Sequence, residues 1–193
     1  MTATPTPSRP VWRTALLGSV AFVALLWVLE VVDQTTGSAL DAEVFANGIT
    51  PRDTDGLVGI LLAPLLHGGF GHLAGNTVPL LVLGFLLLLS GVPRALAVTA
   101  VVWLTAGAGV WLVGAPGVHL GASVLVFGWL AFLLVRGVFA RNLGQVALGL
   151  VLLVVYGGVL WGVLPGDPGV SWEGHLFGAL GGIGAAAVLA RPR

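Results

Sequence analysis

The chain has 193 residues, of which 57% are hydrophobic and only 8% are charged, and its formal net charge is zero. A soluble domain carries about 25% charged residues, so this composition excludes a soluble globule and predicts an integral membrane protein. The balanced charge argues against a nucleic-acid partner. The absence of cysteine excludes disulfides, thiolate metal sites and a cysteine nucleophile.

A membrane-spanning helix needs about 20 mostly apolar residues, and the sequence predicts six such helices in chain order. They are residues 11–32, 72–90, 95–113, 121–139, 145–163 and 172–190. The polar, proline-rich residues 1–10 are expected to be a disordered cytoplasmic tail, which leaves 11–193 as the membrane domain. In the long loop 34–71, the apolar stretch 57–66 is too short to span and Pro64 interrupts it, so it is compatible with a segment that dips into the interface.

Charges of opposite sign fall on opposite sides of this six-span arrangement. One side holds every arginine except Arg52, namely Arg9, Arg13, Arg94, Arg136, Arg141, Arg191 and Arg193. The other side holds all the acids, namely Glu30, Asp33, Asp41, Glu43, Asp53, Asp55, Asp167 and Glu173. Because arginine accumulates on the cytoplasmic side, both termini are predicted to be cytoplasmic. Trp12 then lies near the inner boundary, and Trp111, Trp161 and Trp172 lie near the outer one, as an aromatic belt predicts.

Polar side chains inside a bilayer are costly and mark functional sites there. The candidates are His67, His72, Asn76, Ser123 and His175. His72 and Asn76 are four residues apart, so they share one face of the second span. Ser123 begins the fourth span and His175 the sixth, and all three spans enter from the outer side. The sequence therefore predicts that these groups meet within about two helical turns of the outer surface.

Small residues around Ser123 and His175 favour a close approach of their helices. A hydrogen bond between the two side chains requires heavy atoms within about 3.2 Å. Gly178 and Gly182 lie on the face of His175 and form a small-residue stripe, which lets another helix come near. Gly121 likewise keeps the surroundings of Ser123 small. The pattern predicts a serine nucleophile with a histidine base.

Each of these residues, taken alone, also has a purely structural interpretation. Serine is a favoured N-cap, so Ser123 fits the start of a helix equally well. His175 fits an interfacial histidine bonded to a carbonyl, and Asn76 fits interhelical packing. His119 lies in a loop and is interpreted as incidental, while His67 precedes a glycine-rich turn. The functional interpretation rests on their coincidence at one depth.

Metal chemistry is the main competing chemistry at these residues, and it is not predicted. The chain has no HExxH motif. His67 and His72 are five residues apart across glycines, a poor chelating pair, and Glu173 and His175 point to different faces of their helix. We therefore expect neither a metal nor a cofactor.

Three short motifs follow one another along the second, fourth and sixth predicted spans. They are HGGFGHLAGN at 67–76, GAS at 121–123 and GHLFGALGG at 174–182. The first resembles the H-x4-H-x3-N signature of the rhomboid intramembrane serine proteases, the second the start of their GxSG motif, and the third their histidine helix. The resemblance implies an all-α membrane protein whose six transmembrane helices form a rhomboid-like bundle with both termini in the cytoplasm.

The resemblance also implies a role for each residue. Ser123 would be the nucleophile and His175 the general base, and His72, Asn76 and the backbone N–H of Ser123 would form the oxyanion hole. The supporting residues would be His67, Gly121, Phe127, Gly178 and Gly182. The substrates would be single-pass transmembrane proteins in the lipid bilayer. They would be cut near the outer boundary of the plasma membrane, because the active site faces the extracytoplasmic side.

Two features depart from the family pattern. Val124 follows the serine where the family usually has glycine, and the long first loop lacks the Trp–Arg pair often found there. Val124 supports the alternative of a non-catalytic rhomboid-like protein that binds transmembrane helices. A small transporter is the other alternative, but the inner halves of the spans hold almost no ionisable groups and the two halves show no repeat symmetry.

Overall fold

The computed structural model describes residues 10–36, 48–166 and 169–190, and these residues form an all-helical bundle. Within them, the β pairing found is an isolated bridge between Ile49 and His119. Several sequence expectations fall outside the described residues. These are the tail 1–9 and the sidedness of Arg9, Asp41, Glu43, Asp167, Arg191 and Arg193.

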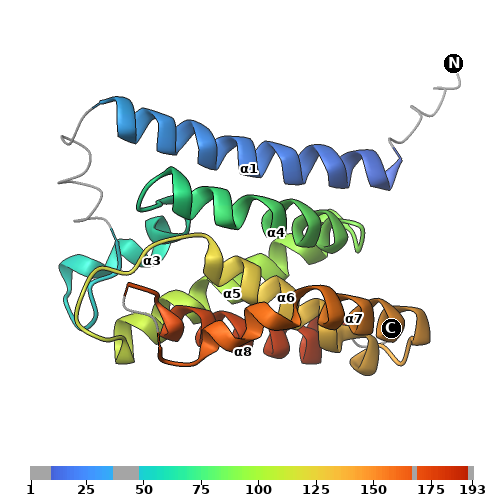
Figure 1. The fold of residues 1–193 in the computed structure, drawn as a ribbon. Helices are drawn as coiled ribbons and strands as arrows, with labels where there is room; N and C mark the ends of the chain where they lie inside the picture. Colours follow the sequence, from blue (N-terminus) through green and yellow to red (C-terminus); the bar gives the residue numbers. More distant parts are fainter. Residues whose placement is uncertain (1–9, 37–47, 167–168, 191–193) are drawn as a thin grey trace, which may run out of the picture.

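A helix occupies each of the six predicted spans (Figure 1). They are α1 (Val11–Thr35), α4 (Phe70–Leu88), α5 (Val92–Val113), α6 (Ser123–Phe139), α7 (Leu143–Tyr156) with the 3-10 helix η3 (Gly157–Val163), and α8 (Trp172–Leu189). Among the described residues, four segments are long and apolar enough to cross a membrane: α1, α4, α5 and α7 with η3. Helix α6 is apolar but shorter, with 17 residues, and α8 is not among the four segments.

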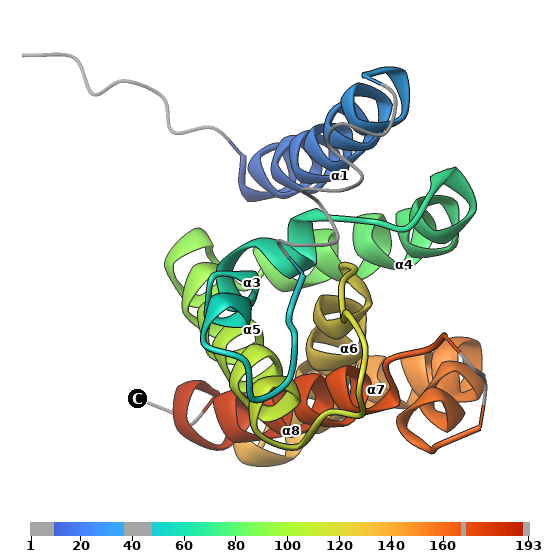
Figure 2. The same ribbon diagram turned by 90° about the vertical axis from the view of Figure 1, so that its left-hand side faces the viewer.

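Helix α6 lies at the centre of the bundle. Seen along the helices, α4, α5, α7 and α8 surround it (Figure 2). Its side chains are buried almost all round, with Leu125, Phe132 and Leu133 fully enclosed. Helix α1 packs along α4 at the edge of the bundle, away from α6. A residue at the start of α6 is therefore surrounded by protein on several sides.

The short apolar stretch in the first loop folds as an interrupted helix beside α5. It consists of η1 (Asp55–Leu57), α3 (Gly59–Leu62) and η2 (Ala63–Leu65), and Pro64 lies where the geometry changes. The indole Nε1 of Trp103 on α5 donates to the carbonyl of Ile60 at 2.9 Å. A Cβ at Gly107 would lie 2.6 Å from Ile60, so α5 accepts this segment only because the residue there is glycine. The segment leads through His67 into α4.

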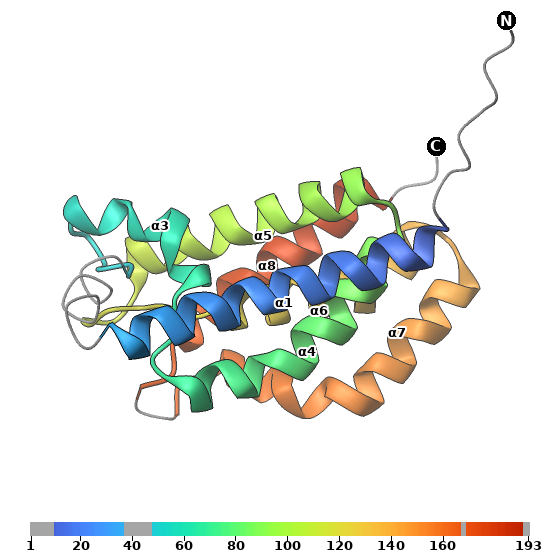
Figure 3. The same ribbon diagram turned by 90° about the horizontal axis from the view of Figure 1, so that it is seen from above.

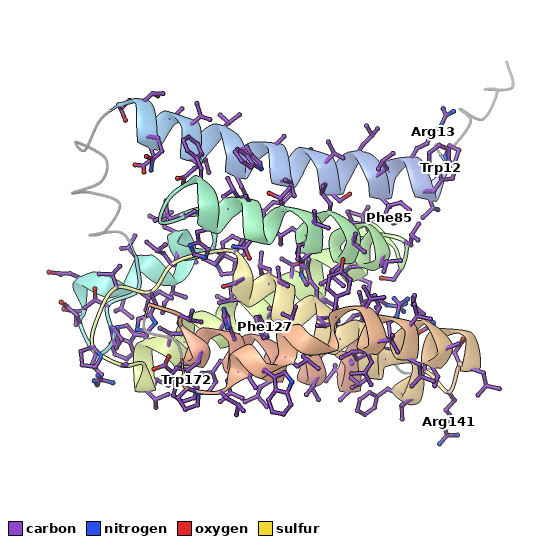
Figure 4. All side chains as sticks on the ribbon, viewed as in Figure 1. Trp12, Arg13, Phe85, Phe127, Arg141 and Trp172 are labelled. Carbon is purple, nitrogen blue, oxygen red and sulfur yellow. The ribbon has the colours of Figure 1, made fainter. Side chains whose placement is uncertain are left out.

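The first residues of α4, α6 and α8 lie at one end of the bundle, where α1 finishes (Figure 3). Arg13 and Arg141 lie at the opposite end together with Trp12, whereas Trp172 lies in the half that contains the helix starts (Figure 4). The fold thus brings the beginnings of the three motif-bearing helices together, which is the arrangement that the sequence predicts.

Candidate active site

Ser123 and His175 form a hydrogen-bonded pair between α6 and α8. Ser123 is the first residue of α6, and His175 lies in the first turn of α8. The hydroxyl Oγ of Ser123 is 2.9 Å from Nε2 of His175, within reach for proton transfer. Ser123 does not cap its helix, because Ala122 holds the cap position and no side chain bonds there. The hydroxyl is thus directed to the histidine.

The second ring nitrogen of His175 fixes which nitrogen carries the proton. Nδ1 is 2.9 Å from the carbonyl oxygen of Gly162 in η3. A carbonyl only accepts, so Nδ1 donates its hydrogen and Nε2 is left with the lone pair that accepts from Ser123. The ring of Phe127 stacks on the imidazole, with centroids 4.0 Å apart and planes 8° from parallel. The histidine is therefore held in the orientation of a general base.

Glycines on α8 allow this approach to α6. A Cβ at Gly178 would lie 2.5 Å from the carbonyl oxygen of Val124, and one at Gly182 would overlap the carbonyl of Gly128. Real side chains do not come this close to backbone atoms. The predicted small-residue stripe is thus the surface of α8 that faces α6.

His72, on α4, lies against the loop that precedes Ser123. Gly121 has a φ of +120°, a conformation that favours glycine. A Cβ on it would lie 2.6 Å from Cε1 of His72, so the imidazole rests against this residue. The N–H of Gly68 donates to Nδ1 of His72 at 3.5 Å, a long contact that leaves Nε2 as the donor. The N–H of Ser123, two residues after Gly121, lies in the first turn of α6, where backbone donors have no acceptor within the helix.

Asn76 lies one turn along α4 from His72 and is buried. Its side-chain nitrogen has no hydrogen-bond partner among the described residues. Leaving a buried polar group unpaired costs about 1–3 kcal/mol, so such a donor calls for an explanation. It gives the α4 side of the site an unused hydrogen-bond donor.

His67 supports the loop that leads to Ser123. The N–H of Ala122 donates to Nε2 of His67 at 3.4 Å, and the His67 ring meets the His72 ring edge-on with centroids 5.2 Å apart. Burial, with the neighbouring charge of His72, lowers the pKa of His67 from 6.5 to about 4. His67 is therefore neutral at pH 7.

Two further hydrogen bonds, which the sequence interpretation did not predict, join the loop before α6 to the start of α8. Nδ1 of His119 is 2.7 Å from Oγ of Ser171, and the N–H of Ala115 donates to Oε1 of Glu173 at 2.8 Å. The sequence interpretation of His119 as incidental did not include this hydrogen bond. No local sequence pattern predicts the contact between His119 and Ser171, because the two residues are 52 positions apart.

A small cavity adjoins the serine. Its volume is about 20 Å³, and a single water needs roughly 10–15 Å³. Its lining includes Ser123, Val124, His119 and Ser171. The side chain of Val124 also points toward α8, because a Cβ at Gly174 would lie 3.1 Å from its Cγ1. In the part of the chain that the structure describes, no three His, Asp or Glu side chains gather as metal ligands.

The family of the chain follows from comparison with known proteins. The model of the Rhomboid domain matches residues 54–192, which include every residue of the site. The chain belongs to the rhomboid family. Rhomboids are in general intramembrane serine proteases, and the family also has inactive members.

Mycobacterial proteins resemble this rhomboid over nearly its whole length. Uncharacterized proteins of Mycobacterium tuberculosis and Mycobacterium bovis are each 50% identical to it over 198 residues, which cover 98% of this chain and 81% of theirs. An uncharacterized protein of Mycobacterium leprae is 46% identical over 198 residues, which cover 98% of this chain and 77% of the relative. These likenesses extend beyond the Rhomboid domain to the region that contains α1.

Proposed function

We propose that this rhomboid is an intramembrane serine endopeptidase that cuts transmembrane segments with a Ser123–His175 dyad. One observation carries the proposal: Ser123 Oγ lies 2.9 Å from His175 Nε2 while Nδ1 of the same ring is bonded to the Gly162 carbonyl. A serine hydroxyl is a weak nucleophile until a positioned base takes its proton. Here the carbonyl orients the histidine, as a carboxylate does in a triad.

The dyad would act in two halves. Ser123 Oγ attacks the scissile carbonyl carbon as His175 Nε2 takes the hydroxyl proton, which forms a tetrahedral oxyanion. The oxyanion collapses, the C–N bond breaks, and the protonated imidazole gives its proton to the leaving amine. Water then attacks the acyl-enzyme with His175 as base again, which releases the new carboxylate and regenerates the serine. The neighbouring cavity has room for such a water.

The oxyanion would be stabilised from two helices. The N–H of Ser123 supplies one donor, and His72 Nε2 and the Asn76 amide supply the others. The contact of His72 with Gly121 and the unpaired amide nitrogen of Asn76 support this assignment. Donors aimed at a developing charge in a low-dielectric site are worth about 10²–10³ in rate each.

The membrane would be crossed six times, by α6 and α8 as well as by the four more apolar segments. At 1.5 Å per residue, the 17 residues of α6 span about 26 Å, less than the roughly 30 Å of the hydrocarbon core. Ser123 would then lie a few ångströms below the outer surface. The arginine side faces the cytoplasm in this arrangement, which puts the dyad on the extracytoplasmic side of the plasma membrane.

The substrates would be single-pass transmembrane proteins. A helix hides its peptide bonds, so a substrate must unwind locally before its backbone can reach Ser123. Residues that weaken a helix near the outer boundary would favour cutting there, with small residues at the cut site. A non-catalytic rhomboid would bind the same segments without cutting them, and Val124 beside the cavity is the feature that favours this second function.

Cleavage of single-pass reporter proteins in liposomes tests the proposal. The reporters carry glycine- and alanine-containing segments at the outer boundary. We expect wild type to cut at least one reporter and Ser123→Ala and His175→Ala each to abolish cutting with the fold intact. Ser90→Ala is the matched control, because this hydroxyl bonds to the Leu87 carbonyl at the other end of α4. Cleavage by either dyad variant would contradict the mechanism, and no cleavage by folded wild type would favour the non-catalytic function.

A further inference from the structure

Two histidine–serine contacts join the same two segments in the same register. The inner contact is Ser123 Oγ to His175 Nε2 at 2.9 Å, and the outer one is His119 Nδ1 to Ser171 Oγ at 2.7 Å. Each joins residues 52 positions apart, and the outer contact lies four residues before the inner one on both segments. The outer contact thus precedes the dyad on the loop into α6 and on the start of α8 alike.

The outer contact is part of a closed set of hydrogen bonds. Nε2 of His119 lies 3.0 Å from the carbonyl of Ala115, whose own N–H donates to Oε1 of Glu173 at 2.8 Å. Glu173 is only 3% exposed, so this bond is shielded from water. The His119 ring therefore joins the two ends of the turn 115–119. The same turn is bonded to Ser171 and Glu173 at the start of α8.

The chemistry of the partners assigns each hydrogen. The Ala115 carbonyl only accepts, so Nε2 of His119 is protonated and donates to it. Nδ1 then accepts from the hydroxyl of Ser171. The same Oγ accepts from the N–H of Gly174 at 3.3 Å and so caps α8. The Ser171 hydroxyl therefore both donates and accepts a hydrogen bond, and it holds the start of α8.

The opposite side of this loop is held as well. Nη1 of Arg52 donates to the carbonyl of Gly114 at 3.0 Å, and the N–H of Arg52 donates to the carbonyl of Trp111 at 2.9 Å. Arg52 adopts a φ of +61°, which is uncommon for a residue with a side chain. The backbone of His119 also pairs with that of Ile49. On the side that faces α8, the loop is held by the His119 ring at Ser171 and by the N–H of Ala115 at Glu173.

We propose that His119 is a positioning residue for the dyad: through Ser171 it sets the distance between the loop into α6 and the start of α8. The inference rests on the proposed protease function. Ser123 lies four residues after His119, and His175 lies four residues after Ser171. Loss of the outer contact would therefore let the two catalytic atoms separate. A misplacement of 1 Å at a reacting centre costs about 10²-fold in rate.

The test is the rate at which a fluorophosphonate labels Ser123 in the purified full chain, measured beside the thermal unfolding midpoint. His119→Ala should label roughly tenfold more slowly or worse, given that sensitivity, with little change in the midpoint. His119→Asn should recover part of the rate, because its amide oxygen can accept in place of Nδ1. Val118→Ala, in the same loop but exposed, is the matched control and should label like wild type.

A double variant tests whether His119 acts through Ser171. His119→Ala combined with Ser171→Ala should label no more slowly than Ser171→Ala alone, because both remove the same contact. Additive losses would overturn this route. Labelling of His119→Ala at the wild-type rate would overturn the proposal itself.

Amide hydrogen exchange separates this inference from the proposed function. If folded wild type is never labelled, the protease proposal fails, but the His119 contact can still be examined. Faster exchange across residues 115–123 in His119→Ala than in Val118→Ala would support the tie between the loop and α8. Equal exchange in the two variants would overturn it.

Discussion

Helices α7 and α8 follow one another in the chain and differ in what they contact. The segment of α7 and η3 has a mean hydropathy of 2.3 in its most apolar window, and 11% of that window is buried. Helix α8 is not among the apolar spanning segments of the described residues, yet it buries Glu173, His175 and a row of glycines and alanines. Hydropathy therefore identifies helices with long apolar surfaces and does not identify α8, whose buried face carries His175.

The same contrast applies to the two helices that carry the dyad. Helix α6 is short and central, and α8 is rich in glycine, so neither resembles an isolated membrane span. Association of helices in a membrane depends on close packing and interhelical hydrogen bonds, which small residues permit. The site lies where glycines of α8 allow a close contact with α6.

A large side chain in place of a glycine between α6 and α8 should have the largest effect on their contact. Gly182→Leu would drive a side chain into the carbonyl of Gly128, and overpacking typically costs 1–3 kcal/mol, with more expected against backbone. We expect loss of the folded protein or a large fall in its unfolding midpoint, together with loss of serine labelling. Gly184→Leu, two residues on, has nothing within 4 Å of its Cβ and should behave like wild type. Equal effects of the two substitutions would contradict the packing argument.

The burial of His67 beside α4 can be tested by the pH dependence of stability. His67 has a pKa lowered from 6.5 to about 4 by burial, so the unfolded chain binds the proton more readily. Its contribution to stability is complete above pH 6.5 and is lost as the pH falls toward 4, by about 3 kcal/mol at 1.36 kcal/mol per pKa unit. Unfolding midpoints in detergent from pH 7 to pH 4 should fall more steeply for wild type than for His67→Gln. If the midpoints of the two proteins fell equally with pH, His67 would not be a buried, neutral side chain.

Gly162 belongs to the largely exposed α7–η3 segment and contacts the site through its carbonyl. A Cβ there would lie 2.8 Å from Phe127 and 3.3 Å from Nδ1 of His175, so Gly162→Ala should displace the imidazole while leaving the fold intact. We expect serine labelling to slow about tenfold, equivalent to about 1.4 kcal/mol in the barrier. Gly158→Ala in the same 3-10 helix meets nothing within 4 Å and is the matched control. Labelling of both variants at the same rate would show that a methyl group at residue 162 does not displace the histidine.

Much of the fold was predictable because it depends on composition and spacing. The apolar runs indicated all six helices, and the glycines at 178 and 182 indicated a close helix contact. The contact of Ser123 with His175 was predictable from the depth at which their helices begin. The break from α7 into η3 at Gly157 was not, although glycine weakens a helix there.

Other parts of the site carry no signal that a single sequence can show. The partner of His175 Nδ1 is the backbone carbonyl of Gly162, and every residue has a carbonyl. The contact of His119 with Ser171 joins a loop to a helix cap across 52 residues, and neither residue belongs to a motif. Such contacts depend on tertiary packing and become visible only in three dimensions.

The most direct test of the account is fluorophosphonate labelling of the folded wild-type protein in detergent, read by intact mass and by the labelled peptide, beside His175→Ala. An activated serine predicts one adduct on wild type, located at Ser123, and none on the variant. An adduct at another serine, or undiminished labelling of His175→Ala, would contradict the dyad. With no adduct on a folded sample, the chain would instead be a rhomboid that binds without cutting, and Val124→Gly would be the next variant to label.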